Sequence, residues 1–338
     1  MPQTLAEAYD VLLLDLDGVV YIGGRPIPGA PEALQRAQQA GARLAYVTNN
    51  ASRTPAAVAD LLESMGAPVS AGDVVTSAQA AARLLADKLP AGSKVLVIGA
   101  PALSLAVRER GLVPVLTAAD SPAAVVQGYA PGIDYSRLAE GGVAVRAGAL
   151  FVATNADSTI PGTRGTQPGN GSLLQVIEHA TGTAPVVAGK PEPPLHRESV
   201  IRTGAKHPLV IGDRLDTDIE AAHNADCDSL LVLTGVDTPR TVTLAPGHRR
   251  PTYIAENLEA LLESYPDVTA AGSGATCGGW TANAPDDGPL TLDGSGAAVD
   301  GLRALAAAAW AAHDKRGGLG GDQVDTALDV LAKAGLRI

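Results

Sequence analysis

The sequence predicts an α/β protein with parallel sheets, and three observations support this class. Short apolar runs alternate along the chain with segments of helical periodicity, the order typical of parallel strands joined by crossover helices. Some of these runs, such as Val11–Leu14, are continuously apolar, as in strands that are buried on both faces. Polar residues follow the runs directly, as they do where open α/β sheets bind ligands.

The composition fits this class and argues against several functions. Hydrophobic residues make up 46% of the 338 residues but aromatic residues only 3%, so the cores must consist mainly of Ala, Val, Leu and Ile. A formal net charge of −11 argues against phosphate-driven binding of nucleic acid. Cys227 and Cys277 are too few for a disulfide framework. The polar N-terminus does not resemble a signal peptide, and no apolar run approaches a membrane span. We therefore expect a cytoplasmic protein that binds neither nucleic acid nor membrane.

The first apolar run leads into two carboxylates. Val11–Leu14 is followed by Asp15, Leu16, Asp17 and Gly18. Two acids at the end of a buried strand are costly to leave without partners, so a cation or a tightly held network must offset their repulsion. Gly18 would let the backbone turn away close to a ligand. The alternative is that both acids cap the next element, and this stretch alone leaves the two interpretations even.

A βαβα order follows a Gly/Pro-rich loop at Tyr21–Gly29. The predicted elements are a helix at Ala30–Ala40, a strand at Arg43–Val47 that ends in Thr48-Asn49-Asn50, a helix between Pro55 and Gly66, and a helix within Val74–Leu89 that begins near Thr76 or Ser77.

The middle of the chain repeats the alternation by itself. Strands are predicted at Lys94–Gly99, Val125–Gln127, Leu150–Ala153 and Val186–Ala188, and helices at Leu103–Arg110, Tyr135–Gly148 and Leu173–Thr181. We therefore expect residues 77–186 to form an inserted α/β domain, and residues 1–76 and 187–265 to form the core. The second part of the core is predicted to hold strands at Leu209–Ile211 and Ser229–Leu233 and a helix at Ile219–Asn224.

The amino-acid composition changes near residue 266. The Gly-rich segments GSGATCGGW and GGLGGD flank an Ala-rich helix predicted over Ala297–Ala312, and an amphipathic helix is predicted over Val324–Ala334. We interpret residues 266–338 as a small accessory region, an appended helical tail without catalytic chemistry. An acetyl- or nucleotide-binding role for it stays open.

Four polar clusters follow strands that we assign to one sheet. They are Asp15 with Asp17, Thr48 with Asn49, Lys190, and Asp213 with Asp218. Each cluster alone could be a helix cap or a surface feature, but their occurrence together is hard to explain in this way. The carboxylates of these clusters outnumber the single lysine, which implies a hard divalent cation, and oxygen ligands favour Mg²⁺. Positioned charge of this kind is most of what phosphoryl transfer requires.

The segments DLDGVVY, TNN, GKP and GDRLDTDIEAA together resemble the four motifs of the haloacid dehalogenase superfamily. The flanking sequence resembles the NagD-like branch, which includes 4-nitrophenylphosphatases, phosphoglycolate phosphatases and pyridoxal-phosphate phosphatases. The resemblance covers about residues 8–262 and implies a Rossmann-like core with a large α/β cap inserted between the second and third motifs. The C-terminal region has no counterpart that we recognise in this branch.

The resemblance implies roles for the first motif. Asp15 would be the nucleophile that forms a phosphoaspartyl intermediate and would also ligate Mg²⁺. Asp17 would protonate the leaving alkoxide, then activate water, and would offer its main-chain carbonyl to the metal. Gly18 would lie close to the substrate. Because dehalogenases and transport ATPases lack an acid at the position of Asp17, hydrolysis of a phosphomonoester is favoured.

The other motifs complete the implied site. Thr48 and Asn49 would hold the phosphate, with Asn50 beside them, and Lys190 would brace Asp15 and the phosphate. Asp213 would ligate Mg²⁺, and Asp218 would orient metal-bound water. The resemblance also makes a homodimer through the cap one candidate arrangement.

The cap is expected to select the leaving group. The stretch Ala153–Gly171 carries the Thr-Asn-x-Asp and Pro-Gly-x-Gly signature of the branch's specificity loop, where Asn155 and Asp157 would anchor the loop or touch substrate. Ile160 stands where pyridoxal-phosphate phosphatases carry a ring-holding His, which favours glycerol 3-phosphate or 2-phosphoglycolate. Arg164 could meet an anionic substrate. The alternatives are pyridoxal 5′-phosphate, a sugar phosphate, a nucleoside monophosphate, or a catalytically idle metabolite-binding protein.

Overall fold

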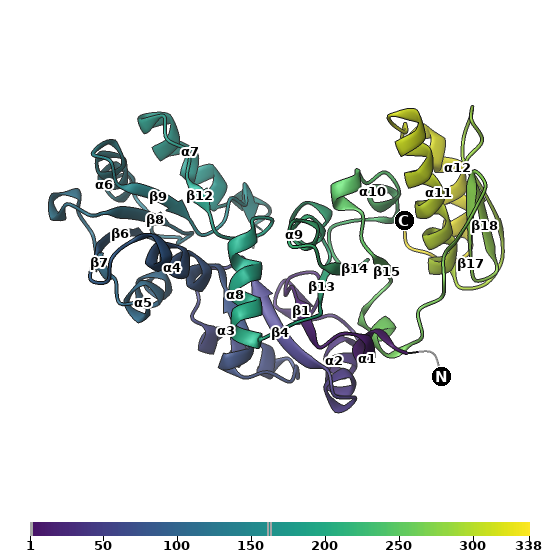
Figure 1. Ribbon diagram of the computed structural model, residues 1–338, viewed down its shortest axis with the longest axis horizontal. Helices are drawn as coiled ribbons and strands as arrows, with labels where there is room; N and C mark the ends of the chain where they lie inside the picture. Colours follow the sequence, from purple (N-terminus) through teal and green to yellow (C-terminus); the bar gives the residue numbers. More distant parts are fainter. Residues whose placement is uncertain (1–2, 161, 163) are drawn as a thin grey trace. The chain divides into compact units, whose positions relative to one another are not determined.

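The computed structural model describes residues 3–160, 162 and 164–338 (Figure 1). The chain forms two compact units, one made of Met1–Arg43 and His207–Ile338 and the other of Leu44–Lys206. The boundaries that the sequence suggests for core and cap, 1–76 with 187–265 and 77–186, stay a prediction.

The first unit holds a row of parallel strands. β1 (Val11–Leu14) pairs with β13 (Pro208–Gly212), β13 with β14 (Asp228–Val232), and β14 with β15 (Tyr253–Ala255). All four residues of β1 are buried, as the continuous apolar run predicts. Because the strands are parallel, their carboxyl ends meet at one edge, and Asp15 and Asp213 follow β1 and β13 there.

Short elements complete this part of the first unit. They are α1 (Leu5–Ala8), the hairpin of β2 (Tyr21–Ile22) and β3 (Arg25–Pro26), α2 (Ala30–Gln39), η3 (Leu215–Ile219), α9 (Glu220–Asn224), α10 (Pro239–Thr243), η4 (Gly247–Arg249) and η5 (Leu258–Leu262). The helix predicted at Ile219–Asn224 is preceded by η3, a π-helical turn that carries Asp218.

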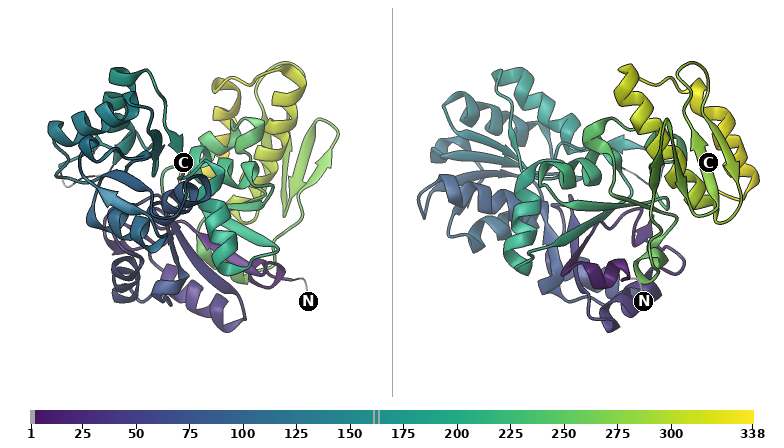
Figure 2. Two further views of the ribbon diagram at one scale, coloured as in Figure 1. Left: turned by 60° about the vertical axis from the view of Figure 1, so that its left-hand side comes forward. Right: turned by 45° about the vertical axis from the view of Figure 1, so that its right-hand side comes forward.

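The C-terminal region is a folded α+β domain, so its interpretation as a helical tail is wrong. Four antiparallel strands pair in the order β16 (Thr269–Ala271), β17 (Gly274–Cys277), β18 (Trp280–Asn283) and β19 (Thr291–Gly294). Helices α11 (Ala298–Arg316) and α12 (Asp322–Lys333) match the two that the sequence predicts, and α11 packs on β17 and β18 (Figure 2). The strands escape sequence analysis because they are short and Gly-rich, which weakens the alternating pattern.

The second unit contains β4 (Arg43–Thr48) and β5 (Val74–Thr76), which are paired in parallel. The helices around them are α3 (Pro55–Ser64), η1 (Ala71–Asp73), α4 (Ser77–Lys88) and α8 (Pro193–Thr203). Thr54 and Thr76 accept main-chain hydrogen bonds in the first turns of α3 and α4, so each helix begins at a side-chain cap.

A second sheet of five parallel strands also lies in this unit. Its order is β12 (Val186–Val187), β9 (Leu150–Ala153), β8 (Ala124–Gln127), β6 (Lys94–Ile98) and β7 (Val113–Val115). The other elements are α5 (Pro101–Glu109), η2 (Ala118–Asp120), α6 (Tyr135–Arg146), α7 (Asn170–Thr181) and the hairpin of β10 (Thr159–Ile160) and β11 (Gln167–Pro168). Phe151 and Ile177 are among the residues that fill its core.

This sheet corrects one expectation. The strand before Lys190 was assigned to the same sheet as β1, but β12 pairs with β9, with Val186 opposite Val152. An apolar run followed by a polar motif predicts a strand end and does not specify the neighbouring strand.

Among the described residues, no helix combines the length and the apolar character needed to cross a membrane.

Candidate active site

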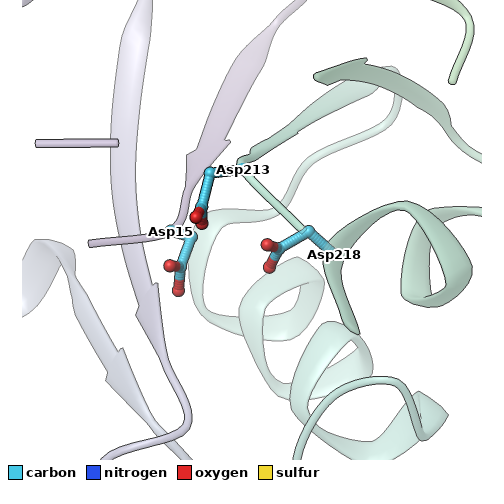
Figure 3. Close-up of side chains that lie close together, drawn as sticks. All are labelled: Asp15, Asp213 and Asp218. Carbon is cyan, nitrogen blue, oxygen red and sulfur yellow. The ribbon is translucent and has the colours of Figure 1, made fainter. Parts of the chain in front are cut away.

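Three carboxylates converge in the first unit. Asp15 follows β1, Asp213 follows β13, and Asp218 points from η3 toward the other two (Figure 3). One oxygen from each carboxylate lies within 4.8 Å of the oxygens from the other two. Asp15 is half-buried, and Asp213 and Asp218 are each only 1% exposed. Such closely spaced buried negative charges repel one another, and a hard cation with oxygen ligands relieves this repulsion. The donor set therefore fits Mg²⁺.

Glycine residues make room for these carboxylates. A Cβ atom at Gly18 or at Gly235 would overlap the carboxylate of Asp213, and one at Gly212 would overlap Asp218. Gly18 also has a φ of +88°, a conformation that other residues adopt only with strain. The close approach of the backbone at these three positions explains why glycine stands there.

A loop after β14 holds Asp213. The carboxylate oxygen Oδ2 accepts a hydrogen bond from the Val236 N–H at 2.8 Å, and the Asp213 carbonyl accepts one from the Asp237 N–H at 3.1 Å. Thr234 Oγ1 donates to the Gly18 carbonyl at 2.5 Å. The sequence predicts the strand at Ser229–Leu233, but nothing in it places Thr234 and Gly235, which follow that strand, beside Asp213.

Asp17 is separate from the three-carboxylate group. Its side chain is exposed, yet partial desolvation by the surrounding protein raises the pKa of its carboxyl above the ordinary value. The turn around it is fixed by a hydrogen bond of 2.8 Å from the Gly18 N–H to the Tyr21 carbonyl. A carboxyl that keeps its proton more readily is suited to protonating a leaving group.

In the second unit, Asn49 holds Lys190 next to Thr48. Asn49 Oδ1 accepts from the Lys190 N–H at 2.8 Å, and Asn49 Nδ2 donates to the Lys190 carbonyl at 3.1 Å. Lys190 is 7% exposed, and its Nζ donates to the Val47 carbonyl at 3.3 Å. Since Thr48 and Asn49 are adjacent, the second and third motifs form one local structure.

The specificity loop is tied to the same structure. Asn155 Nδ2 donates to the Asn49 carbonyl at 2.8 Å, and the Asp157 carboxylate accepts from Asn49 Nδ2 at 3.3 Å. Ser77 Oγ also donates to the Asn49 carbonyl, at 2.6 Å, and Asn170 Nδ2 donates to the Asn155 carbonyl at 2.7 Å. These contacts favour the anchoring role for Asn155 and Asp157. Ser77 was missed although it lies at a predicted helix start, and Asn170 was missed because the helix predicted from Leu173 begins at Asn170 in the structure.

The remaining predicted residues lie on turns and on the hairpin. Asn50 is exposed, and its Oδ1 accepts from the N–H groups of Ser52 and Arg53, so the side chain caps the turn before α3. Ile160 is half-buried on β10, and Arg164 is exposed between β10 and β11. Their contact with substrate stays a prediction.

Comparison with known proteins supports the resemblance to the haloacid dehalogenase superfamily. Residues 12–113 match the family of haloacid dehalogenase-like hydrolases, residues 187–261 match the HAD-hydrolase-like family, and residues 277–336 match the GCN5-related N-acetyltransferase-like domain. The chain is 48% identical over 259 residues to the D-glycerol 3-phosphate phosphatase of Mycobacterium tuberculosis, covering 77% of this chain and 72% of that one. It is 38% identical over 254 residues to the 5′-nucleotidase YutF of Bacillus subtilis, covering 75% and 97%.

Solved structures extend the similarity to the C-terminal domain. The structure of a glycerol phosphate phosphatase from Mycobacterium tuberculosis in complex with calcium matches with a TM-score of 0.87 and 39% identity over 99% of both chains. A thermostable NPPase from Geobacillus stearothermophilus matches with a TM-score of 0.68 and 33% identity over 74% of this chain and 97% of that one. The expectation that the C-terminal region lacks a counterpart is therefore wrong for the mycobacterial structure.

The parallel α/β fold, with carboxylates grouped at the ends of its strands, is typical of hydrolases that transfer phosphoryl groups. The chain belongs to the haloacid dehalogenase-like hydrolases, in their NagD-like branch of phosphatases.

Proposed function

We propose that the protein hydrolyses glycerol 3-phosphate to glycerol and phosphate with Mg²⁺. The observation that carries this proposal is the 48% identity to a D-glycerol 3-phosphate phosphatase. The match over 99% of both chains with a glycerol phosphate phosphatase, C-terminal domain included, supports it further. The aliphatic side chain of Ile160 on the hairpin agrees with a small leaving group that has no aromatic ring.

The carboxylates of Asp15 and Asp213, which lie together with that of Asp218, would hold the metal. As the family motifs imply, the main-chain carbonyl of Asp17 would be a further ligand and Asp218 would orient bound water. When bound, Mg²⁺ supplies positive charge that neutralises the phosphate oxygens. We assign Lys190 Nζ and Thr48 Oγ1 to the same phosphate, as the family motifs imply. Asn49 then acts by holding Lys190.

The chemistry proceeds in two steps at phosphorus. A carboxylate oxygen of Asp15 attacks the phosphorus, and the bond to the glycerol oxygen breaks while Asp17 gives that oxygen its proton. Asp17, now ionised, takes a proton from a water molecule, whose oxygen attacks the phosphorus of the aspartyl phosphate. Phosphate leaves, and both carboxyl groups return to their starting states.

Sugar phosphates and nucleoside monophosphates are the second candidates. The Bacillus subtilis relative is named a 5′-nucleotidase, and a relative from Staphylococcus aureus that is 35% identical over 260 residues is named an acid sugar phosphatase. Because the mycobacterial relative is more similar, we place glycerol 3-phosphate first.

Phosphate release with Mg²⁺ tests the substrate. The panel contains glycerol 3-phosphate, 2-phosphoglycolate, pyridoxal 5′-phosphate, glucose 6-phosphate and a nucleoside monophosphate. We expect kcat/KM for glycerol 3-phosphate to exceed the others by about tenfold or more, which corresponds to about 1.4 kcal/mol in transition-state stabilisation. A preference for another ester would support phosphatase activity but reject glycerol 3-phosphate as the substrate.

A cytoplasmic location and a homodimer through residues 77–186 also stay proposals. Cell fractionation would check the first, and sedimentation of the purified protein would check the second.

A further inference from the structure

The loop that holds Asp213 is connected at both ends to the C-terminal domain, through α10 on one side and through β15 on the other. This loop, residues 233–238, joins β14 to α10 and is called the Asp213 loop below. Besides the two hydrogen bonds to Asp213, it contributes the Asp237 carboxylate, which accepts from the Leu215 N–H at 2.6 Å where η3 begins. The loop therefore contacts Asp213 directly and the element that carries Asp218 through one hydrogen bond.

At the loop's exit, α10 rests on α11. The first turn of α10 is capped by Thr238, and Val242 on this helix is completely buried. The Val242 carbonyl accepts a hydrogen bond from the indole Nε1–H of Trp310 on α11 at 2.9 Å. The Arg250 guanidinium lies 5.7 Å from the centre of the Trp310 ring and forms two hydrogen bonds of 2.7 Å to Asp314. The Arg250 guanidinium thus packs against one face of the Trp310 indole ring, while the indole N–H binds the Val242 carbonyl of α10.

At the loop's entry, β14 is supported through β15. The Leu233 N–H donates to the Ala255 carbonyl at 3.0 Å, so the strand pairing extends into the loop. Next to Ala255, the Ile254 carbonyl accepts from Nε of Arg303 on α11 at 2.9 Å. Arg303 is only 8% exposed, and its charge is balanced by Asp300 at 2.6 Å and by the Tyr265 ring, whose centre lies 4.1 Å from the guanidinium carbon.

Apolar packing makes a third connection. Leu215 and Ile219 of η3 belong to one buried cluster with Leu302, Leu305 and Ala309 of α11. One helix of the C-terminal domain therefore supports both ends of the Asp213 loop and the turn that carries Asp218. Figure 1 shows α10 and α11 next to each other in the same part of the first unit.

From these contacts we propose that Trp310 and Arg303 are positioning residues, through which the C-terminal domain sets the geometry of the metal-binding carboxylates. Mg²⁺ demands near-ideal octahedral geometry, whereas Ca²⁺ accepts six to eight ligands in flexible arrangements. Loosening of the Asp213 loop should therefore weaken Mg²⁺ binding more than Ca²⁺ binding. The proposal rests on the proposed function only in taking the carboxylate group as a divalent-cation site.

The test is calorimetric titration of the full-length protein with Mg²⁺ or Ca²⁺ in the absence of substrate. Trp310→Phe removes the N–H donor and keeps an aromatic ring. We expect its Kd for Mg²⁺ to rise about three- to tenfold and its Kd for Ca²⁺ to change less than about twofold. The effect on Mg²⁺ is small because Trp310 acts on the metal ligands only through α10 and the Asp213 loop, whereas loss of a group that contacts a ligand directly typically weakens metal binding by about 10- to 100-fold. Arg303→Lys keeps the positive charge but lacks the planar guanidinium group with its several N–H donors. We expect it to weaken Mg²⁺ binding as well.

Leu331→Val is the matched control. Leu331 is fully buried on α12 next to Gly301, inside the C-terminal domain. Loss of one methylene there should cost about 1 kcal/mol of stability while the hydrogen bonds of Trp310 to Val242 and of Arg303 to Ile254 stay in place. We expect it to bind Mg²⁺ like the wild type.

Three results would overturn the proposal. They are wild-type Mg²⁺ affinity in Trp310→Phe, equal weakening in Leu331→Val, and equal weakening for the two cations. Failure of the proposed function is recognised separately, since the protein would then bind Mg²⁺ with the expected selectivity and leave glycerol 3-phosphate intact.

Discussion

Asn49 holds the main chain of Lys190 with both ends of its side-chain amide, accepting from the N–H at 2.8 Å and donating to the carbonyl at 3.1 Å. The two residues come from different motifs, and the same Asn49 also receives hydrogen bonds from Ser77 and Asn155 on its own carbonyl. Placement of the lysine is therefore a property of the whole network around Asn49.

Asn49→Ala tests this relationship. Because Lys190 loses both of its main-chain contacts to Asn49, its ammonium group should be misplaced, and we expect kcat/KM to fall by about 10²-fold. Lys190→Ala should cost at least as much, and the double variant should be no worse than Lys190→Ala alone, since both changes remove one function. Additive losses in steady-state kinetics would show that Asn49 acts independently of Lys190.

Asp15→Asn removes the proposed nucleophile with almost no change in shape. We expect turnover to fall by roughly four orders of magnitude or more, as it does when other enzymes lose a nucleophile. The fold should persist, because one of three mutually repelling carboxylates is neutralised. Circular dichroism and phosphate release check the two parts. Asp60→Asn, at an exposed position on α3, is the matched control and should leave activity unchanged. Turnover by Asp15→Asn near the wild-type rate would remove Asp15 from its role.

Asp17→Asn should affect substrates according to their leaving groups. Glycerol needs a proton as it leaves, so phosphorylation by glycerol 3-phosphate should slow by about 10²- to 10⁴-fold. The 4-nitrophenolate ion leaves without a proton, so 4-nitrophenyl phosphate should still phosphorylate Asp15, while the later attack of water lacks its base. Stopped-flow absorbance should therefore show a burst of about one nitrophenolate per protein followed by slow turnover. Equal slowing of both substrates, without a burst, would contradict the acid–base role.

Removal of divalent metal should abolish turnover, and Mg²⁺ should restore it. Binding to the three-carboxylate group should also stabilise the fold, by about 2.7 kcal/mol when free Mg²⁺ is 100 times its Kd. Denaturant unfolding with and without Mg²⁺ measures this gain, which Asp213→Asn should largely lose. Activity that persists in a strong chelator would exclude the metal assignment. Ca²⁺ is expected to inhibit, because its larger coordination number can engage both oxygens of Asp15 and prevent their attack.

The carboxylate group was the part of the site most open to prediction from sequence. Asp15 and Asp213 each follow a buried strand, and parallel strands bring their carboxyl ends to one edge, so chain order alone indicates that these side chains meet. Asp218 was included because its acidic turn directly follows Asp213. The roles of Trp310 and Arg303 carry no such signal, since their partners are main-chain carbonyls far away in the sequence.

Sheet membership and the C-terminal strands were harder to predict for physical reasons. The two-residue strand β12 pairs with β9 through tertiary packing, and its own sequence does not distinguish one sheet from another. In β17 and β18, four glycines in and beside the strands interrupt the pattern that would have indicated a hairpin. Side-chain amide contacts such as those of Asn49 depend on the finished fold, so no spacing rule reveals them.

Rapid acid quench of the protein during turnover of glycerol 3-phosphate with Mg²⁺, followed by peptide mass spectrometry, tests the central claim most directly. The account predicts an acyl phosphate on Asp15, in at most one copy per chain, that forms fast enough to support turnover and is absent from Asp15→Asn. Turnover without a phosphorylated Asp15, or phosphate on another residue, would contradict it.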